Sequence, residues 1–479
     1  MRRRLWFRIL AIAFGLSLVG ACELVLRQFD WGAPQTAGDP FVGFAEIHPL
    51  FELNPETQRY EIPVNRQTFF QPDSFPATKS ERTFRIFVFG GSTVQGRPYA
   101  IETSFTTWLK LNLRALAPDR DWQVVNCGGV SYASYRLLPI LRETLAYEPD
   151  MFIVYTGHNE FLEARSYAQT KRLASTSGPV FKTLANSRLY ALSSQACNQL
   201  LTSQQPKPQL AAEVDALLDY RGGLAKYHRD DPWRDQVIQH FEYNLQRMIA
   251  VSDANDIPLV LVNPVANLRD SPPFKMECSS DLSAAEREQV KTTWERAKAL
   301  PAAQTEQAVE LLRAALAIDS RHPGLWFHLA KCLDRSGQHE LAKQAYLRAK
   351  DEDICPLRVM ESQAAAMRRV AHATKTPWID ARAEFARLSP QTIVGKELMI
   401  DHVHPTIRGH QLIAELLVDE LIRLGTLSAQ TDWRETQHAD YKHHLAQLDA
   451  TYFERGRERL AGLRRWSEGR ALKVMEQEP

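Results

Sequence analysis

A buried strand that ends in a glycine pair and a serine constrains this chain more than any other feature. Residues 84–96 read FRIFVFGGSTVQG, and the apolar run at their start predicts a buried strand. Gly90 and Gly91 then permit a sharp turn because neither carries a Cβ. Ser92 follows at the predicted start of a helix, whose first N–H groups lack partners within the helix. Taken alone, the pattern is more typical of an ordinary Gly-Ser turn than of a nucleophile.

Strands and helices alternate from residue 82 onward. Between and around the strands, helices are predicted at 104–117, 135–147, 239–254 and 361–374, and the strands themselves lie at 84–89, 122–126, 151–155, 258–263 and 377–380. Short apolar strands separated by helices favour an α/β fold with a parallel sheet covered on both faces. In such sheets a ligand site forms at the carboxyl ends of the strands.

The first thirty residues, 1–30, predict a membrane segment. Arg2, Arg3 and Arg4 precede an apolar run from about residue 9 to 26, which approaches the roughly 20 residues that span a bilayer. The arginines predict a cytoplasmic N-terminus and therefore a body on the extracytoplasmic side, periplasmic or cell-surface. An uncleaved transmembrane signal-anchor is favoured over a lipoprotein signal with Cys22 as the lipid-bearing residue, because apolar residues continue past Cys22.

Composition and periodicity set further boundaries. Residues 31–80 are rich in Pro, Asn, Gln and aromatic side chains, which predicts a stalk that wraps onto the domain. Residues 162–238 form a long polar insertion, which is equally consistent with a lid, a substrate wall or a structural excursion. The predicted order is a stalk at 31–80, the α/β domain at 81–282 with its insertion at 162–238, a helical insertion at 283–354, the rest of the α/β domain at 355–427, and a charged helical tail at 428–479.

The helical insertion has an internal period. Ala308, Leu312 and Ala315 lie 34 residues before Ala342, Tyr346 and Ala349, which is the length of a tetratricopeptide repeat. About one and a half repeats cannot bury their own faces. The segment must therefore pack on the main domain or on a protein partner, as a simple hairpin of two amphipathic helices would also have to do.

The charge balance argues against nucleic-acid binding and the cysteine spacing against a cysteine metal site, while one disulfide pairing stays open. Lys and Arg number 58 against 57 Asp and Glu, so no global field recruits nucleic acid. The six cysteines lack metal-ligand spacing. Cys278 and Cys355 flank the helical insertion and are the best-placed disulfide pair, although buried thiols are at least as expected.

Three further segments follow strands and supply groups that a nucleophilic serine needs. Residues 126–132 (NCGGVSY) form a small-residue loop with backbone N–H groups, and residues 157–160 (GHNE) offer the amide of Asn159. Residues 401–405 (DHVHP) place Asp401 three residues before His404, so the carboxylate can orient the imidazole. Together they provide the nucleophile, base, orienting acid and oxyanion hole of acyl transfer.

Two rival sites fit less well. The α/β-hydrolase elbow, G-x-S-x-G, fails because Val94 occupies the second glycine position. A hydrolytic metal centre on Asp401, His402 and His404 would leave Ser92 and Asn159 without a role. We therefore expect no metal and no cofactor, and His410 is expected to cap or pack the last helix of the α/β domain.

The blocks GGST, NCGGVSY, GHNE and DHVHP resemble those of the SGNH/GDSL hydrolase superfamily. The helical insertion and the phrase YTGHNEFLE further resemble an exported bacterial subgroup that carries tetratricopeptide repeats. The resemblance implies a three-layer α/β fold with a five-stranded parallel sheet. It also implies Ser92 as nucleophile, His404 as base and Asp401 as its orienter, with an oxyanion hole made by the N–H of Ser92, the side chain of Asn159 and an N–H of either Ser131 or Gly129.

Two positions depart from the family pattern. Ser131 stands where the second block usually has glycine, and Glu160 stands where the third block usually has aspartate. Glu160 is therefore expected either to stay structural or to reach a substrate hydroxyl.

The sequence thus predicts a serine ester hydrolase that acts outside the cytoplasm on an O-acyl ester, such as an acetyl ester on a carbohydrate, through an acyl-enzyme. One alternative is an O-acyltransferase that uses the same triad on an exported glycan. Another is a catalytically silent, membrane-tethered scaffold that binds a protein through the repeat segment. Candidates for the pocket wall, for which salt bridges or packing are the favoured roles, are Arg97, Tyr99, Arg269 and Arg358.

Overall fold

The computed structural model describes residues 2–28, 46–163, 209–210, 214–219, 223–428 and 433–475. The chain divides into two units, one of Met1–His48 with Arg165–Ala212 and one of Pro49–Ala164 with Glu213–Pro479. The first unit contains helix α1 (Arg2–Gln28) and two short strands, β1 (Glu46–Ile47) and β8 (Gln209–Leu210), which pair in parallel. All elements described below belong to the second unit.

The expected membrane-spanning signal-anchor is not supported. A helix does form at the N-terminus as α1, but no helix in the described part of the chain is long and apolar enough to cross a membrane. Arg8 and Glu23 bound the longest uncharged run of α1, residues 9–22, which is shorter than the roughly 20 residues that a span needs.

The second unit is built on the predicted five-stranded sheet, and all its neighbouring strands run parallel in the order β10-β9-β7-β5-β6. The strands are β5 (Thr83–Gly90), β6 (Asp121–Gly128), β7 (Met151–Tyr155), β9 (Leu259–Val262) and β10 (Trp378–Ile379). The chain places β6 on one side of β5 and β7 on the other. The strand order therefore reverses at β5, and the carboxyl end of such a strand is where open α/β sheets form their ligand crevice.

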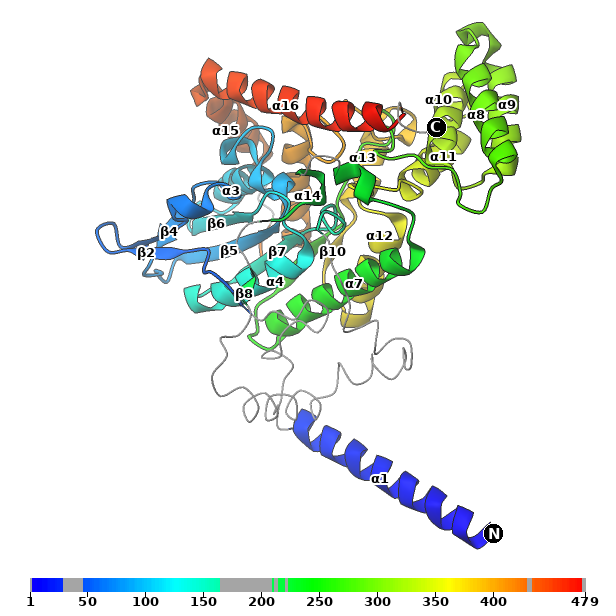
Figure 1. Ribbon diagram of the computed structural model, residues 1–479. Helices are drawn as coiled ribbons and strands as arrows, with labels where there is room; N and C mark the ends of the chain where they lie inside the picture. The colour runs from blue at the N-terminus through cyan, green and yellow to red at the C-terminus, as the bar shows by residue number, and fades with distance from the viewer. Residues whose placement is uncertain are drawn as a thin grey trace. The chain divides into compact units, whose positions relative to one another are not determined.

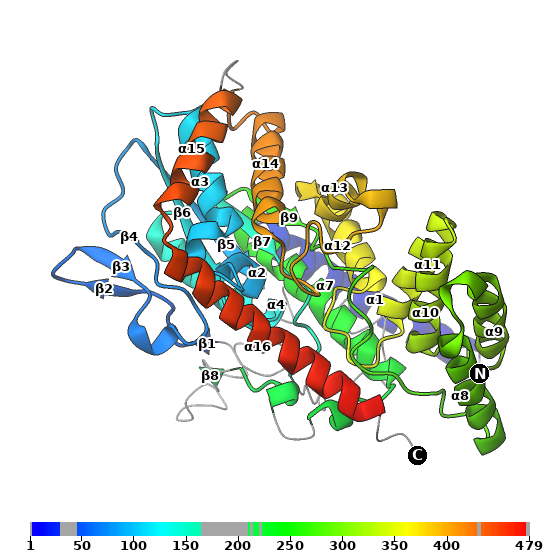
Figure 2. The same cartoon turned by 90° about the horizontal axis from the view of Figure 1, so that it is seen from above.

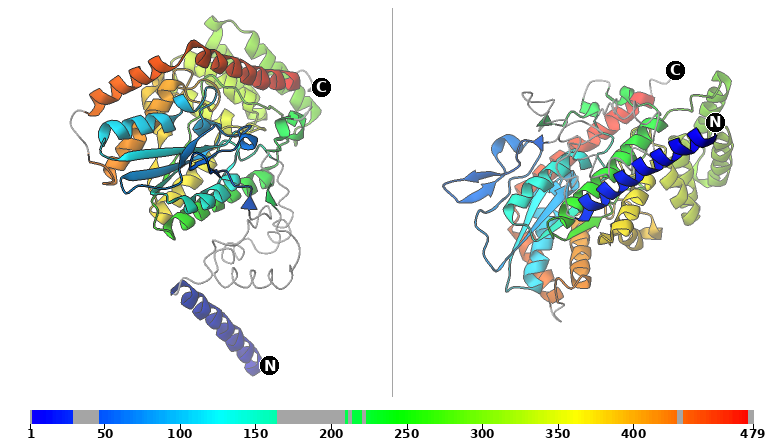
Figure 3. Two further views of the ribbon diagram at one scale, coloured as in Figure 1. Left: turned by 90° about the vertical axis from the view of Figure 1, so that its left-hand side faces the viewer. Right: turned by 90° about the horizontal axis from the view of Figure 1, so that it is seen from below.

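Helices cover both faces of this sheet and complete the three layers (Figure 1 and Figure 3). Ile86, Val88 and Ile153 are fully buried in one core with Trp108 and Leu417. One layer consists of α3 (Phe105–Leu116), α14 (Ile407–Arg423) and α15 (Trp433–Gln447), and the other of α4 (Ser134–Thr144), α7 (Asp231–Asp253) and α12 (Glu361–Thr374). Helix α13 (Ala381–Leu388) follows β10 directly.

Residues 49–80, the described part of the predicted stalk within this unit, pack against the sheet. They form an antiparallel sheet of β2 (Glu52–Asn54), β3 (Arg59–Glu61) and β4 (Ser74–Pro76). The ring of Phe75 lies 5.4 Å from that of Phe87 in β5. This segment therefore extends the core of the α/β domain. Most of the predicted insertion 162–238 lies outside the described residues.

The repeat segment forms two helical hairpins with a core of their own. Its helices are α8 (Ala284–Ala299), α9 (Thr305–Ile318), α10 (Pro323–Arg335) and α11 (His339–Asp351). The residues spaced by 34 are buried, three in α9 and three in α11. Cys278 packs against this core and Cys355 lies in a separate cluster, both as thiols. The sequence left a disulfide between them open, with buried thiols at least as expected, and this disulfide is not formed.

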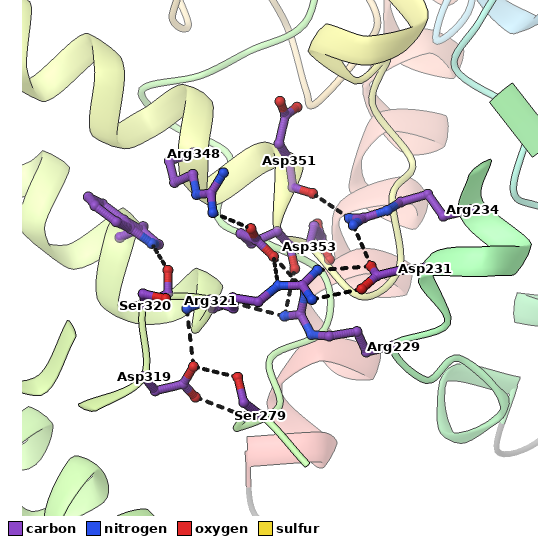
Figure 4. A network of polar contacts seen from close by, with 12 residues as sticks. Arg229, Asp231, Arg234, Ser279, Asp319, Ser320, Arg321, Arg348, Asp351 and Asp353 are labelled. Carbon is purple, nitrogen blue, oxygen red and sulfur yellow. Dashed lines mark hydrogen bonds and ion pairs between the residues drawn. The ribbon is translucent and has the colours of Figure 1, made fainter. Parts of the chain in front are cut away.

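A network of charged side chains joins the repeat segment to α7 (Figure 4). Glu352 accepts from Arg229 at 2.5 Å and from Arg321 at 3.2 Å, and Arg348 reaches the same carboxylate at 2.8 Å. Arg321 also forms two hydrogen bonds with Asp231 at the start of α7, of 2.7 and 2.9 Å. The repeat segment thus packs on the α/β domain, which is one of the two arrangements the sequence allowed.

The C-terminal tail is helical, as predicted, but part of it packs on the domain. Helix α15 contributes Trp433 and Tyr441 to the core beside α3. Helix α16 (Ala450–Met475) places the hydroxyl of Tyr452 2.8 Å from Thr103 Oγ1 and stacks its ring on Tyr99. Helix α16 therefore covers the loop that follows Ser92 (Figure 2).

Candidate active site

Ser92 occupies the tight turn that the sequence predicts. Strand β5 ends at Gly90, and the short helix α2 (Ser92–Gln95) begins at the serine. A Cβ on Gly90 would lie 2.2 Å from the carbonyl oxygen of Tyr155, and one on Gly91 would lie 2.4 Å from Asn159 Nδ2. The glycine pair therefore lets the turn approach its neighbours and sets Ser92 at the switch point of the sheet.

Ser92, His404 and Asp401 form a continuous hydrogen-bonded triad. Ser92 Oγ lies 2.7 Å from His404 Nε2, and His404 Nδ1 lies 2.6 Å from Asp401 Oδ2. The histidine comes from a loop 312 residues away in sequence, yet it meets the serine at normal hydrogen-bond length. Both ring nitrogens of His404 are thus engaged.

The surroundings of Asp401 hold it as an ionised carboxylate. Its Oδ1 accepts the N–H groups of Val403 at 2.9 Å and His404 at 2.8 Å. Burial alone would raise the pKa of Asp401, but the charge and hydrogen bond of His404 and the charge of His402 together hold it below its ordinary value. An ionised Asp401 accepts only, so His404 Nδ1 carries the proton and Nε2 accepts from the Ser92 hydroxyl.

In the loop of residues 126–132, one backbone N–H is left that could bind an oxyanion. Gly128 N–H donates to Asn126 Oδ1 at 2.9 Å. The N–H of Gly129 donates to the Gly90 carbonyl at 3.0 Å, so Gly129, one of the two predicted donors, is occupied. Ser131 N–H has no acceptor among the described residues, and its φ of 63° lies in the left-handed region, which favours glycine.

Asn159 lies beside the same turn. Its Nδ2 donates to the Tyr132 carbonyl at 3.1 Å and is the atom that a Cβ on Gly91 would strike. One of its two amide hydrogens is therefore left for another acceptor. The N–H of Ser92 belongs to the first turn of α2, where no intrahelical acceptor exists. The Asn159 amide and the Ser92 N–H therefore lie at the same turn, next to Ser92 Oγ.

Glu160 has a structural position. Its carboxylate is fully buried and accepts the N–H of Ser134 at 2.7 Å and the Ser134 hydroxyl at 3.0 Å. It thereby satisfies the N-terminus of α4, where a negative charge is favourable. Of the two roles expected for Glu160, the structure shows the structural one.

The other histidines near the site are buried supports. His158 Nδ1 accepts the N–H of Val359 at 3.1 Å, and burial followed by the charges of His402 and His404 places its pKa well below its ordinary value. Burial lowers the pKa of His402 to about 4. His410 accepts the N–H of Phe105 at 3.2 Å in the packing role expected for it. Among the residues described, no group of three or more His, Cys, Asp or Glu is placed to hold a metal ion.

Three of the four pocket-wall candidates have side-chain partners in the described part of the chain, and the guanidinium of the fourth, Arg97, has no hydrogen-bond acceptor there. Arg269 pairs with Asp334 at 2.9 Å, and Arg358 donates to the carbonyl of Ser271 at 2.6 Å, as the favoured reading expects. Tyr99 stacks on Tyr452. Arg97 N–H donates to the Ser92 carbonyl at 3.1 Å, while its guanidinium has no hydrogen-bond acceptor in the described part of the chain.

Two residues that the sequence analysis did not single out hold the site's loops together. Asn126 Nδ2 donates to the Val94 carbonyl at 2.6 Å, which joins the second block to α2. Thr93 Oγ1 donates to the Val403 carbonyl at 3.2 Å, which joins α2 to the loop that carries His404. The only available signal was their position inside the motifs NCGGVSY and GGST.

Comparisons with known proteins match two parts of this description. The tetratricopeptide repeat family model matches residues 299–353, and no curated protein matches the chain. Similar solved structures include a lipase/acylhydrolase from Enterococcus faecalis (14% identity, TM-score 0.33, 73% of this chain and 99% of that one). Others are an acetyl-xylooligosaccharide esterase from Geobacillus stearothermophilus (13%, TM-score 0.32, 72% and 96%) and a GDSL-like lipase from Bacteroides thetaiotaomicron (10%, TM-score 0.30, 75% and 95%).

The family model thus identifies a tetratricopeptide repeat at residues 299–353, whereas the resemblance to GDSL-type hydrolases rests on the sequence motifs. At these scores the likeness says nothing about activity. Membership of an exported bacterial subgroup stays a prediction.

Proposed function

We propose that the protein is a serine ester hydrolase that cleaves an O-acyl ester through an acyl-enzyme on Ser92. The observation that carries this proposal is the continuous Ser92–His404–Asp401 chain, with bonds of 2.7 and 2.6 Å. A serine, a base and an orienting acid in this contact constitute an activated nucleophile. None of the three residues belongs to the tetratricopeptide match at residues 299–353.

In the first step Ser92 Oγ attacks the ester carbonyl carbon while His404 Nε2 takes the hydroxyl proton. The carbonyl oxygen becomes an oxyanion, which the N–H groups of Ser92 and Ser131 and the amide of Asn159 stabilise. The C–O bond to the alcohol then breaks, and His404 returns the proton to the leaving oxygen. The acyl group remains on Ser92.

In the second step His404 takes a proton from water, whose oxygen attacks the acyl carbon. The bond to Ser92 Oγ breaks, the serine regains its proton from His404, and the carboxylic acid leaves. Throughout, Asp401 stays ionised and stabilises the imidazolium that forms twice per cycle.

Labelling with a fluorophosphonate tests the nucleophile without knowledge of the substrate. We expect one covalent adduct, mapped by peptide mass spectrometry to Ser92 and absent from Ser92→Ala. The matched control is Ser336→Ala, which removes a serine hydroxyl that donates only to the Leu333 carbonyl. An unlabelled wild-type chain would overturn the proposal and favour the catalytically silent scaffold.

The same triad would serve an O-acyltransferase, so the acceptor needs its own measurement. We expect that added sugar alcohols leave the yield of free acid from an aryl acetate unchanged, because water is the acceptor. Diversion of most acyl groups to the sugar would instead favour the transferase. Extracytoplasmic location and a carbohydrate-linked substrate stay predictions from sequence.

A further inference from the structure

A cavity separate from the triad lies at the edge of the sheet. Its volume is about 440 Å³, within the range of small-ligand sites. Its wall comes from the ends of β9 and β10, from α12 and α13, and from α11 of the repeat segment. None of Ser92, Asn159, Asp401 and His404 lines it. The repeat segment and the α/β domain therefore build this space together.

The wall of the cavity contains buried polar atoms without partners. Asn263, 4% exposed, donates through Nδ2 to Asp380 Oδ1 at 3.0 Å, but its Oδ1 accepts nothing from the described residues. Trp378 Nε1 is likewise a buried donor without an acceptor there. A buried unpaired polar atom is costly, and both residues line the cavity. They leave one acceptor and one donor for a polar ligand.

The charged side chains of the wall are mostly cationic. Four cations line the cavity against two carboxylates, namely Lys343, Lys350, Arg368 and Arg382 against Glu361 and Asp380. Glu361 is already shared by Lys350 at 3.2 Å and by Arg382. Among the described residues, the Lys343 ammonium donates a hydrogen bond to the hydroxyl of Thr392, at 3.3 Å. In the described part of the chain, neither Lys343 nor Arg368 has a carboxylate partner.

We propose that this cavity binds a small hydroxylated anion, a sugar acid or a sugar phosphate. The cations Lys343 and Arg368 would neutralise the carboxylate or phosphate, as charge-assisted hydrogen bonds. The Asn263 carbonyl would accept a hydroxyl hydrogen, and the Trp378 indole would donate to a hydroxyl oxygen. A neutral sugar lacks the ionic interaction with Lys343 and Arg368. A bare inorganic anion lacks the sugar hydroxyls that would bond to Asn263 and Trp378.

Isothermal titration of the full chain with glucuronate, glucose 6-phosphate, glucose and inorganic phosphate tests this site. We expect at least one of the two sugar anions to bind, with glucose and phosphate each about tenfold weaker or more. The tighter of the two sugar anions identifies the anionic group. The proposal would be overturned if neither sugar anion binds. It would also be overturned if glucose or phosphate binds as tightly as the sugar anions do.

Variants place the binding in the cavity. Lys343→Met and Arg368→Met should each weaken the sugar anion about tenfold. Arg369→Met should not, because this neighbouring arginine of α12 pairs outside the cavity with Glu242 at 3.0 Å. Bound ligand should shift the indole N–H resonance of Trp378, assigned by its loss in Trp378→Phe. The site would be contradicted if Lys343→Met and Arg368→Met bind the sugar anion with the affinity of the wild type. It would also be contradicted if the ligand leaves the Trp378 resonance unshifted.

The proposal does not depend on the esterase. The Ser92→Ala variant, which removes the nucleophile, should bind the sugar anion as the wild type does. Loss of binding in Ser92→Ala would contradict a site separate from the triad.

Discussion

At the residue scale, main-chain groups position several of the side chains of the proposed active site. Two backbone N–H groups orient Asp401. Because Gly90 and Gly91 lack a Cβ, the Tyr155 carbonyl and the Asn159 side chain can approach the turn closely. The sequence predicts Ser92, His404 and Asp401 as a triad because these residues lie in short motifs after strands. It could not choose between Ser131 and Gly129 as donor, because that choice depends on the Gly90 carbonyl, which occupies the Gly129 N–H.

Asn159→Ala should slow ester turnover by on the order of 10²–10³, because loss of one oxyanion donor raises the barrier by about 2.7–4 kcal/mol. Stopped-flow rates of aryl acetate hydrolysis measure the change, and the thermal midpoint should stay close to that of the wild type. Asn255→Ala is the control, since that exposed amide donates only to the Val251 carbonyl. Unchanged turnover in Asn159→Ala would remove Asn159 from the oxyanion hole.

Ser131→Gly should keep turnover within about threefold of wild type, because the proposed donor is a main-chain N–H. The variant should also be more stable by about 1 kcal/mol, since glycine adopts the left-handed conformation of Ser131 without strain. Turnover and urea unfolding check both statements. A large loss of turnover in this variant would show that the Ser131 hydroxyl takes part.

At the scale of elements, the length of the apolar runs decided what was predictable. The five strands of the main sheet were predicted from stretches in which apolar residues stand together or alternate with polar ones. By contrast, β2, β3 and β4 have three residues each and show no periodicity. Helix α7 begins eight residues before its predicted start, where Asp230 caps it through the Trp233 N–H. Pairing partners and caps of this kind are set by tertiary contacts.

Glu352→Gln should lower the free energy of unfolding by about 1–3 kcal/mol, because three arginines lose their shared carboxylate. Limited proteolysis should then cut preferentially within residues 283–351, which the network joins to α7. A substitution of the exposed Glu310 of α9, Glu310→Gln, is the control and should change the free energy of unfolding by no more than about 0.5 kcal/mol. Equal stability of the two variants would mean that the network does not hold the repeat segment.

At the scale of the whole molecule, buried histidines make stability depend on pH. The pKa is lowered to about 3 for His410 and to about 4 for His402, in both cases by burial first. A folded protein with lowered histidine pKa values binds fewer protons than the unfolded chain, so stability falls as the pH drops below about 6.5. The loss is complete only below the folded pKa values. Sequence alone cannot predict it, because burial depends on packing.

His410→Gln should flatten this decline by roughly 1.4 kcal/mol per pH unit between about pH 6 and pH 4. Glutamine can still accept the Phe105 N–H but takes up no proton. Urea unfolding at pH 6.5, 5.5 and 4.5 measures the slope, with a substitution of the exposed His438 of α15, His438→Gln, as control. Parallel slopes for the wild type and His410→Gln would show that His410 does not stay neutral in the fold.

The most direct measurement of the central claim is the rate of aryl acetate hydrolysis by the wild type and by Ser92→Ala at equal folded concentration. If Ser92 is the nucleophile, the wild type turns over and the variant loses at least about 10⁴-fold in kcat. An acetylated intermediate should also accumulate on the wild type alone and be visible by intact mass. Equal turnover by the two proteins, or acetylation at another residue, would contradict the catalytic assignment of Ser92.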